Sequence, residues 1–165
     1  MSLGYRIDLE EPILPRLDRK TRNTVRRAQR SLDARQGTLD ELKALHWDPV
    51  YLPRSLSPRQ HVFVATLGGL PVSAILLEDA GDHLVYRFAG NDRSHIDLGG
   101  NTLLLWWAAE HYRGKYRYID LGGSAKTGID GYKRRVSTSS YPLKRKPLHQ
   151  RLLAKLKYHL KRLMR

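Results

Sequence analysis

Two glycine-containing stretches of the sequence combine backbone freedom with polar or cationic residues, as anion-binding sites do. The first is LGGN, residues 98–101, which follows a predicted strand and precedes a predicted helix. Glycines there expose backbone N–H groups at a helix N-terminus, where the helix dipole also favours an anion. Leu98, Gly99, Gly100 and Asn101 are therefore candidates for holding a phosphate or pyrophosphate. An ordinary strand-to-helix turn with its cap is the alternative interpretation.

The second stretch is YIDLGGSAKTGIDGYKRRV, residues 118–136. A predicted strand ends at Gly122 and Gly123, so the chain can lie close to whatever fills the space beyond the strand. A helix of about two turns then brings Tyr132 and Lys133 back toward that space. A lysine at a helix start opposes the helix dipole, which indicates a bound anion or a charge that develops in a reaction. A solvated basic patch is the alternative.

Other kinds of catalytic site have no motif in this sequence. The seven histidines are scattered and there is no cysteine, so we expect no metal site. No serine lies in a nucleophile-elbow motif, and no phosphate-binding loop of the nucleoside triphosphatases is present. Helix-turn-helix and zinc-finger spacings are also missing, so no element is predicted to read a DNA sequence.

The formal net charge of +14 points to a polyanionic partner such as RNA, DNA, a phosphorylated small molecule or anionic lipid. Much of this charge lies in residues 16–30 and in the part after Asp130, which contains no further acidic residue. Like charges gathered in blocks repel one another and favour an external partner over a merely solubilising surface. The predicted nucleic-acid contacts are Arg22, Arg26, Arg27, Arg30, Lys155 and Arg162.

The periodicity of the chain predicts a single mixed α/β domain with a mostly antiparallel sheet. An amphipathic helix over 14–32 and a short helix over 39–45, capped by Thr38, precede a meander of three strands over 61–90. A buried helix over 101–113, capped by Asn101 or Thr102, connects to a strand over 116–123. A short helix and a strand over 138–144 follow. We expect Leu103, Leu104, Trp107, Ile119 and Leu121 to be buried.

The last part of the chain is set apart by its composition. Residues 1–145 are predicted to form the globular domain, and residues 146–165 a basic amphipathic helix of the same domain. This helix could dock on the domain, contact nucleic acid or lie on a membrane surface. No apolar run is long enough to span a membrane and no signal-peptide pattern is present, so a cytoplasmic location is expected.

The order of these elements resembles the C-terminal acyltransferase domain of the Fem family. The resemblance rests on YRFAGNDRSHIDLGGNTLLLWWAAEHYRGKYRYIDLGG followed by GIDGYKRRV, with KTRNTVRRAQR upstream as the basic helix that opens that domain. It covers roughly residues 16–143. Fem proteins are aminoacyl-tRNA-dependent transferases that build peptidoglycan cross-bridges, and they use the fold of the GCN5-related N-acetyltransferases (GNATs).

The resemblance implies roles for particular residues. The family follows its DLGG strand with a glycine, an aromatic residue and a lysine, which here are Gly131, Tyr132 and Lys133. The aromatic residue and the lysine face the aminoacyl end of the tRNA, and the lysine stabilises charge in the transition state. Tyr132 and Lys133 are thus the expected catalytic residues. The expected donor-binding residues are Arg87, Leu98, Gly99, Gly100, Asn101, Gly122, Gly123 and Arg134.

The sequence also departs from its relatives. Fem enzymes have two copies of the fold, whereas this chain has room for one, so the acceptor amine stays undefined. GNATs favour Arg or Gln three residues before the first loop glycine, where this chain has Ile96, and this favours a donor other than acyl-CoA. Val136 stands where the Fem family tends to place an aromatic residue.

Three hypotheses follow for the function. The first is transfer of an aminoacyl group from aminoacyl-tRNA to an amine, with tRNA as the partner. The second is an N-acyltransferase that uses acyl-CoA. The third is a non-catalytic module that binds RNA or a membrane through the C-terminal helix. In every case no tightly bound cofactor is expected, because the acyl donor is a substrate.

Overall fold

The computed structural model describes residues 3–143 together with residues 156 and 160. The predicted helix over 146–165 therefore lies almost entirely outside the described residues, as do Lys155 and Arg162.

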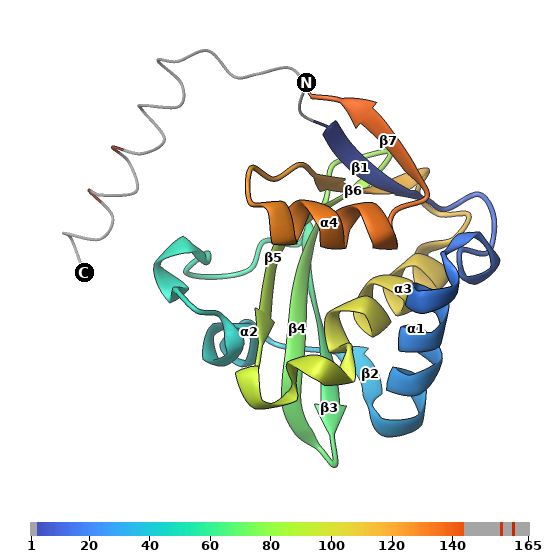
Figure 1. Ribbon diagram of the computed structural model, residues 1–165. Helices are drawn as coiled ribbons and strands as arrows, with labels where there is room; N and C mark the ends of the chain where they lie inside the picture. The colour runs from blue at the N-terminus through green and yellow to red at the C-terminus, as the bar shows by residue number, and fades with distance from the viewer. Residues whose placement is uncertain (1–2, 144–155, 157–159, 161–165) are drawn as a thin grey trace.

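A seven-stranded sheet forms the centre of the protein, in the order β2-β3-β4-β5-β6-β1-β7 (Figure 1). Only the β5–β6 pair is parallel, so the prediction of a mixed and mostly antiparallel sheet is confirmed. The predicted meander is β3 to β5, with positive φ angles of 55° at Gly68 and 88° at Gly69 in its first turn. The strands are β1 (Leu3–Asp8), β2 (Asp33–Gln36), β3 (Gln60–Leu67), β4 (Leu70–Asp79), β5 (Leu84–Asn91), β6 (Tyr118–Gly122) and β7 (Ser139–Pro142).

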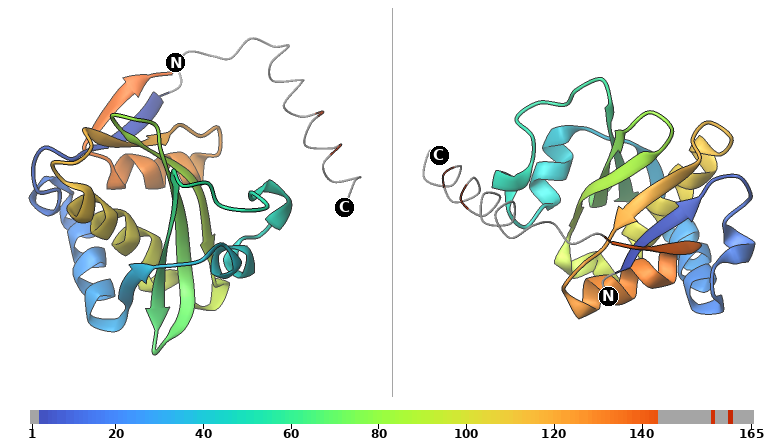
Figure 2. Two further views of the ribbon diagram at one scale, coloured as in Figure 1. Left: turned by 180° about the vertical axis from the view of Figure 1, so that it is seen from behind. Right: turned by 90° about the horizontal axis from the view of Figure 1, so that it is seen from above.

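Helices cover both faces of this sheet, as the view from above shows (Figure 2). The larger core lies between the sheet and α1, α3 and α4, and the smaller core between the sheet and α2. Alternate strand residues point to the two cores, as the pleat requires: Phe63 and Ile75 face the larger one, Val64 and Leu76 the smaller. The helices are α1 (Arg19–Ser31), α2 (Leu39–Leu45), α3 (Gly100–Tyr112) and α4 (Thr127–Val136), with short 3₁₀ turns η1 (Leu14–Arg16), η2 (Pro49–Tyr51) and η3 (Arg93–Leu98).

The structure corrects several local predictions. Strands β1 and β2 were not expected, and β1 lies between β6 and β7, which come more than a hundred residues later in the chain. Helix α1 begins at Arg19 with Asp18 as its N-cap, because Pro15 holds the preceding turn in 3₁₀ geometry. Thr38 caps α2 in a full capping box, as predicted. Trp107 is only half-buried, while the other expected core residues are buried: Leu103, Leu104, Ile119 and Leu121.

The parallel strands β5 and β6 separate soon after they meet. They are in register only at Leu84 with Ile119 and at Val85 with Asp120, although both continue beyond these residues. The register of β5 against β4 shifts next to Tyr86, so Arg87 is the extra residue of a bulge. The end of β6 is thus left without a partner on its β5 side, directly before the Gly122–Gly123 turn.

Candidate active site

A cavity of about 470 Å³ lies on the α3 side of the sheet, and three elements supply most of its wall. Helix α1 contributes Lys20 and Thr24, and the η3–α3 junction contributes the glycine turn. Helix α4 contributes the remaining wall. The full lining is Lys20, Thr21, Thr24, Asn91, Ile96, Asp97, Gly99, Gly100, Asn101, Thr102, Gly128, Ile129, Tyr132, Arg135 and Val136.

The two glycines of the LGGN motif allow α3 to begin at the cavity wall. Gly99 has φ +77°, and a Cβ atom there would lie 2.5 Å from Cγ2 of Thr24. A Cβ atom on Gly100 would lie 2.2 Å from Oγ of Ser73, which donates a hydrogen bond to Asn91. Gly99 is the N-cap, so the prediction of Asn101 or Thr102 as the cap was wrong. No side chain among the described residues caps this helix, which leaves its first amides available to a ligand.

Tyr132 contributes a buried hydroxyl group beside this turn. The hydroxyl has no hydrogen-bond partner among the described residues, although Thr102 lies close enough to lower its pKa in part. Burial raises the pKa of Tyr132 to about 12, and Arg135 offsets a little of that effect. Burial also raises the pKa of Tyr86 well above its usual value, with a further contribution from Tyr132. Both phenols therefore stay protonated at neutral pH and can donate hydrogen bonds.

Lys133 is half-buried and points at the unpaired end of β6 rather than into the cavity. Its Nζ donates hydrogen bonds to the backbone carbonyl oxygens of Leu121, at 2.5 Å, and Gly123, at 3.3 Å. Helix α4 begins at Thr127, so Lys133 lies in the last turn, where a cation interacts favourably with the dipole. The argument from an unfavourable dipole at a helix start was therefore wrong. The sequence underestimated this helix, which has 10 residues.

Carboxylates tie α4 and β6 to strands β1 and β7 around Lys133. The Tyr5 hydroxyl on β1 donates to Asp130 on α4 at 3.0 Å, and the Tyr141 hydroxyl on β7 donates to Asp120 on β6 at 2.7 Å. Burial lowers the pKa of Lys133, while the charges of Asp120 and Asp130 act in the opposite direction. The two tyrosine hydrogen bonds therefore hold the carboxylates whose charges act on the Lys133 ammonium group.

We predict that the Asp130→Asn variant shifts the alkaline limit of activity to lower pH. Removing the Asp130 charge removes one interaction that raises the pKa of Lys133, so the lysine loses its proton at a lower pH. The asparagine oxygen can still accept the hydrogen bond from Tyr5. The variant therefore tests the effect of the Asp130 charge while the hydrogen bond is kept. The check is the pH profile of kcat; an unchanged alkaline limb would mean that the protonation of Lys133 does not govern turnover.

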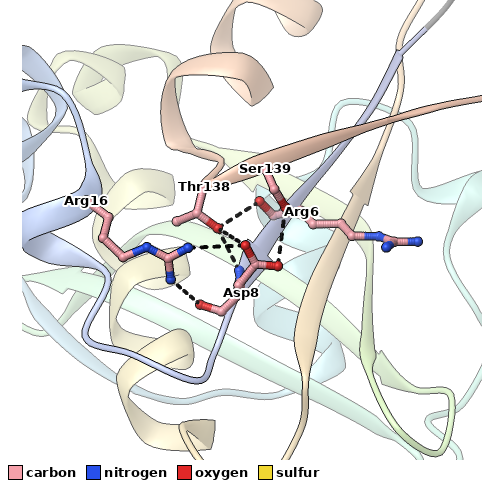
Figure 3. A network of polar contacts seen from close by, with 5 residues as sticks. All are labelled: Arg6, Asp8, Arg16, Thr138 and Ser139. Carbon is pink, nitrogen blue, oxygen red and sulfur yellow. Dashed lines mark hydrogen bonds and ion pairs between the residues drawn. The ribbon is translucent and has the colours of Figure 1, made fainter.

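A second polar network holds the segment that leaves α4 (Figure 3). The Asp8 carboxylate accepts hydrogen bonds from Thr138 at 2.9 Å and from Ser139 at 3.2 Å, and it pairs with Arg16 at 3.2 Å. The backbone N–H of Asp8 in turn donates to Thr138 Oγ1. This network fastens the chain after Val136 to β1, and so keeps α4 in place over the cavity.

Several predicted site residues have other contacts. Arg87 is exposed and forms a two-point contact with Glu78 on β4, at 2.8 and 3.2 Å. A Cβ atom on Gly123 would lie 2.5 Å from the carbonyl oxygen of Leu3, so packing against β1 explains that glycine. Leu98 packs against the core, and Arg134 is exposed. Of the predicted donor-binding residues, Gly99, Gly100 and Asn101 are brought together at the cavity, and Gly122 lies next to Lys133.

The exposed face of α1 forms a basic hollow of about 820 Å³, lined by Arg19, Lys20, Asn23, Thr24, Arg26, Arg27 and Arg30. We call it the α1 hollow. It shares Lys20 and Thr24 with the cavity, so the two adjoin. Arg22 was expected among these residues but turns away, donating to the carbonyl oxygens of Leu17 at 2.6 Å and Pro15 at 3.3 Å.

Sequence reasoning missed two residues of the cavity lining, Arg135 and Asp97. Arg135 follows Lys133 and Arg134 in the sequence, so the sequence alone does not show which of the three cations faces the cavity. The position of each residue around helix α4 determines this, and only Arg135 lines the cavity. In the part of the chain that the structure describes, no group of three or more His, Cys, Asp or Glu side chains is placed to hold a metal ion. Within the same part, no helix is both long and apolar enough to cross a membrane.

Comparison with known families identifies the fold. The acetyltransferase (GNAT) domain family matches residues 52–134, just over half of the chain. The chain belongs to the GNAT family. The GNAT match contains β3 to β6, the glycine turn and most of α4, including Tyr132 and Lys133. No curated protein matches the sequence.

Solved structures share this GNAT fold at low sequence identity. FemX aligns over 85% of the chain with a TM-score of 0.69 and 12% identity, which confirms the Fem-like fold. A GCN5-related N-acetyltransferase from Kribbella flavida aligns over 86% with a TM-score of 0.54 and 15% identity. The C-terminal domain of a putative lysylphosphatidylglycerol synthetase from Agrobacterium fabrum aligns over 81% with a TM-score of 0.53 and 17% identity. This GNAT domain corresponds to 60%, 53% and 51% of those chains, respectively.

Proposed function

We propose that this GNAT domain transfers an aminoacyl group from aminoacyl-tRNA to an amine acceptor. The observation that carries the proposal is the junction of the α1 hollow with the cavity at the start of α3. A row of cations that leads to a small cavity suits a donor with a long polyanionic body and a small reacting end. The net charge of +14 and the similarity of the fold to FemX support the same donor.

The reaction needs little beyond positioning and charge stabilisation. The acceptor amine attacks the carbonyl carbon of the aminoacyl ester, and its electron pair forms the new C–N bond while the carbonyl oxygen becomes an oxyanion. The intermediate then collapses: the C=O bond re-forms, the C–O bond to the ribose breaks, the amine nitrogen loses one proton and the ribose oxygen gains one. On this proposal Lys133, whose Nζ now contacts the carbonyl oxygens of Leu121 and Gly123, exchanges one of these contacts for the substrate and stabilises the oxyanion. The protonated Tyr132 hydroxyl, which has no hydrogen-bond partner among the described residues, donates a hydrogen bond to the ribose oxygen on the same proposal.

Acyl-CoA is the alternative donor, and one observation favours it. The glycine turn presents uncapped amides at the start of α3, which suits a pyrophosphate group. On that hypothesis the α1 hollow has no role in donor binding. A non-catalytic role in binding RNA or a membrane through residues 146–165 is the second alternative; it rests on residues outside the described part of the chain.

We expect RNA to bind the α1 hollow with strong salt dependence, because each neutralised phosphate releases a counterion. Charge reversal by Arg26→Glu together with Arg27→Glu should weaken binding and reduce the log–log salt slope by about 1 to 2. The matched control reverses Arg54 and Arg59, which are exposed on the loop that follows η2. Equal losses in the two double variants would mean that net charge, rather than this hollow, holds the RNA.

A direct comparison of donors tests the proposed function. Binding of charged tRNA, uncharged tRNA and acetyl-CoA is measured at one stated salt concentration. We expect both tRNAs to bind more tightly than acetyl-CoA, and acetyl-CoA to compete weakly for the cavity. Tighter binding of acetyl-CoA than of either tRNA at that salt concentration would favour the acyl-CoA alternative.

A further inference from the structure

The wall of the cavity carries a carboxylate, Asp97. A carboxylate is unusual in a phosphate-binding site, because both groups are negatively charged and repel each other. Asp97 belongs to η3, lines the cavity together with Gly99 and Gly100, and is exposed. Its side chain makes no hydrogen bond or ion pair with any described residue. Its backbone carbonyl accepts a hydrogen bond from Arg27 at 2.8 Å, which fixes this part of η3 against α1.

The cavity lining carries only a small positive charge. Lys20 and Arg135 are the only basic residues in the described lining, so with Asp97 the lining carries a net charge of +1. One phosphate is well matched to the α3 amides and these two cations. A second phosphate brings further negative charge into a cavity that already holds a carboxylate, and like charges at short range repel.

The rest of the wall suits a nucleoside. Ile96 and Ile129 are 57% and 44% exposed and both line the cavity, so they offer apolar surface on which a flat base can pack. Carboxylate oxygens accept hydrogen bonds from ribose hydroxyl groups. The buried Tyr132 hydroxyl, unpartnered among the described residues, adds a polar contact for the ligand at the inner wall.

We propose that Asp97 selects the class of donor: it admits a nucleotide with a single phosphate, such as the terminal nucleotide of an RNA, and discriminates against a diphosphate. This inference rests on the proposed function, since it takes the cavity to be the donor site. It goes further by naming the group that is recognised and the residue that rejects the competing donor.

The test is calorimetric titration of AMP, ADP, coenzyme A and the dinucleotide cytidylyl-(3′,5′)-adenosine into the wild-type protein and Asp97→Asn. We expect the wild-type protein to prefer AMP and the dinucleotide. Asp97→Asn should raise affinity for ADP and coenzyme A by about tenfold and change that for AMP by less than about twofold. Asp33→Asn is the control. It changes the net charge by the same amount at an exposed position that follows the C-terminal end of α1 and does not line the cavity.

Three results would overturn the inference: tighter binding of ADP than AMP by the wild-type protein, equal gains for ADP in the two variants, or no binding of AMP. Preference for AMP without binding of the dinucleotide would overturn the assignment to an RNA end. The titrations contain no acyl group, so failure of aminoacyl transfer would leave these results unchanged and would count against the proposed function alone.

Discussion

Lys133→Ala should lower turnover by about tenfold to a thousandfold and weaken donor binding far less. The oxyanion that Lys133 is proposed to stabilise exists only in the transition state, whereas the α3 amides and the α1 hollow are the groups proposed to hold the donor. Lys133→Arg should restore little, because a planar guanidinium group cannot reproduce a compact ammonium between the carbonyls of Leu121 and Gly123. The measurements are kcat and the donor Kd.

Arg134→Ala is the matched control, since Arg134 is the next residue along α4 and is exposed. It should leave turnover unchanged and lower donor affinity only slightly. If all three variants lose a little affinity and keep their turnover, this part of α4 is a solvated basic surface and not a catalytic centre. Thermal unfolding of Lys133→Ala separates a catalytic loss from a structural one, because its two carbonyl contacts also disappear.

Gly100→Ala should destabilise the fold by about 1–3 kcal/mol and weaken donor binding together with it. The new methyl group would lie 2.2 Å from Oγ and 2.6 Å from Cβ of Ser73, so α3 and β4 must move apart. That movement strains the Ser73–Asn91 hydrogen bond and displaces the amides at the cavity wall. Chemical denaturation and a titration with AMP measure the two effects.

Two further variants isolate the cause of this loss. Gly128→Ala should not destabilise the protein, because nothing lies within 4 Å of its Cβ position and alanine favours a helix by about 0.5–1 kcal/mol. Adding Ser73→Gly to Gly100→Ala removes both clashing atoms and should recover part of the lost stability. No difference between Gly100→Ala and Gly128→Ala would contradict the close packing of α3 on β4.

Local patterns in the sequence were enough to predict most elements. The apolar stripe of α1, the capping box at Thr38 and the glycine pair after β3 each act within a few residues, so they can be read without the fold. The succession of β5, α3 and β6 implied a parallel pair, which the structure contains. Strand β1 could not be predicted in this way, because its alternating residues gain their meaning only from pairing with β6 and β7.

The candidate site was predictable where it depends on backbone and unpredictable where it depends on side-chain direction. The Gly99–Gly100 turn was recognisable because two adjacent glycines between a predicted strand and a predicted helix mark a tight turn of the backbone. The direction of the Lys133 side chain depends on where α4 begins. Because α4 begins at Thr127, Lys133 lies near the helix C-terminus, where a cation is favourable, and not near the N-terminus, where it would be unfavourable. The carboxylate of Asp97 joins the cavity only through the packing of η3 against α1, which no local pattern records.

The central claim is transfer from aminoacyl-tRNA, and a single-turnover assay tests it most directly. tRNA that carries a labelled aminoacyl group is mixed with excess protein and a set of primary amines near neutral pH, and the label is followed from the ester into an amide. A reaction without protein measures the uncatalysed background, and labelled acetyl-CoA is the competing donor. We predict amide formation from aminoacyl-tRNA well above that background and little from acetyl-CoA. Rapid transfer from acetyl-CoA, with none above background from aminoacyl-tRNA, would contradict the proposed function.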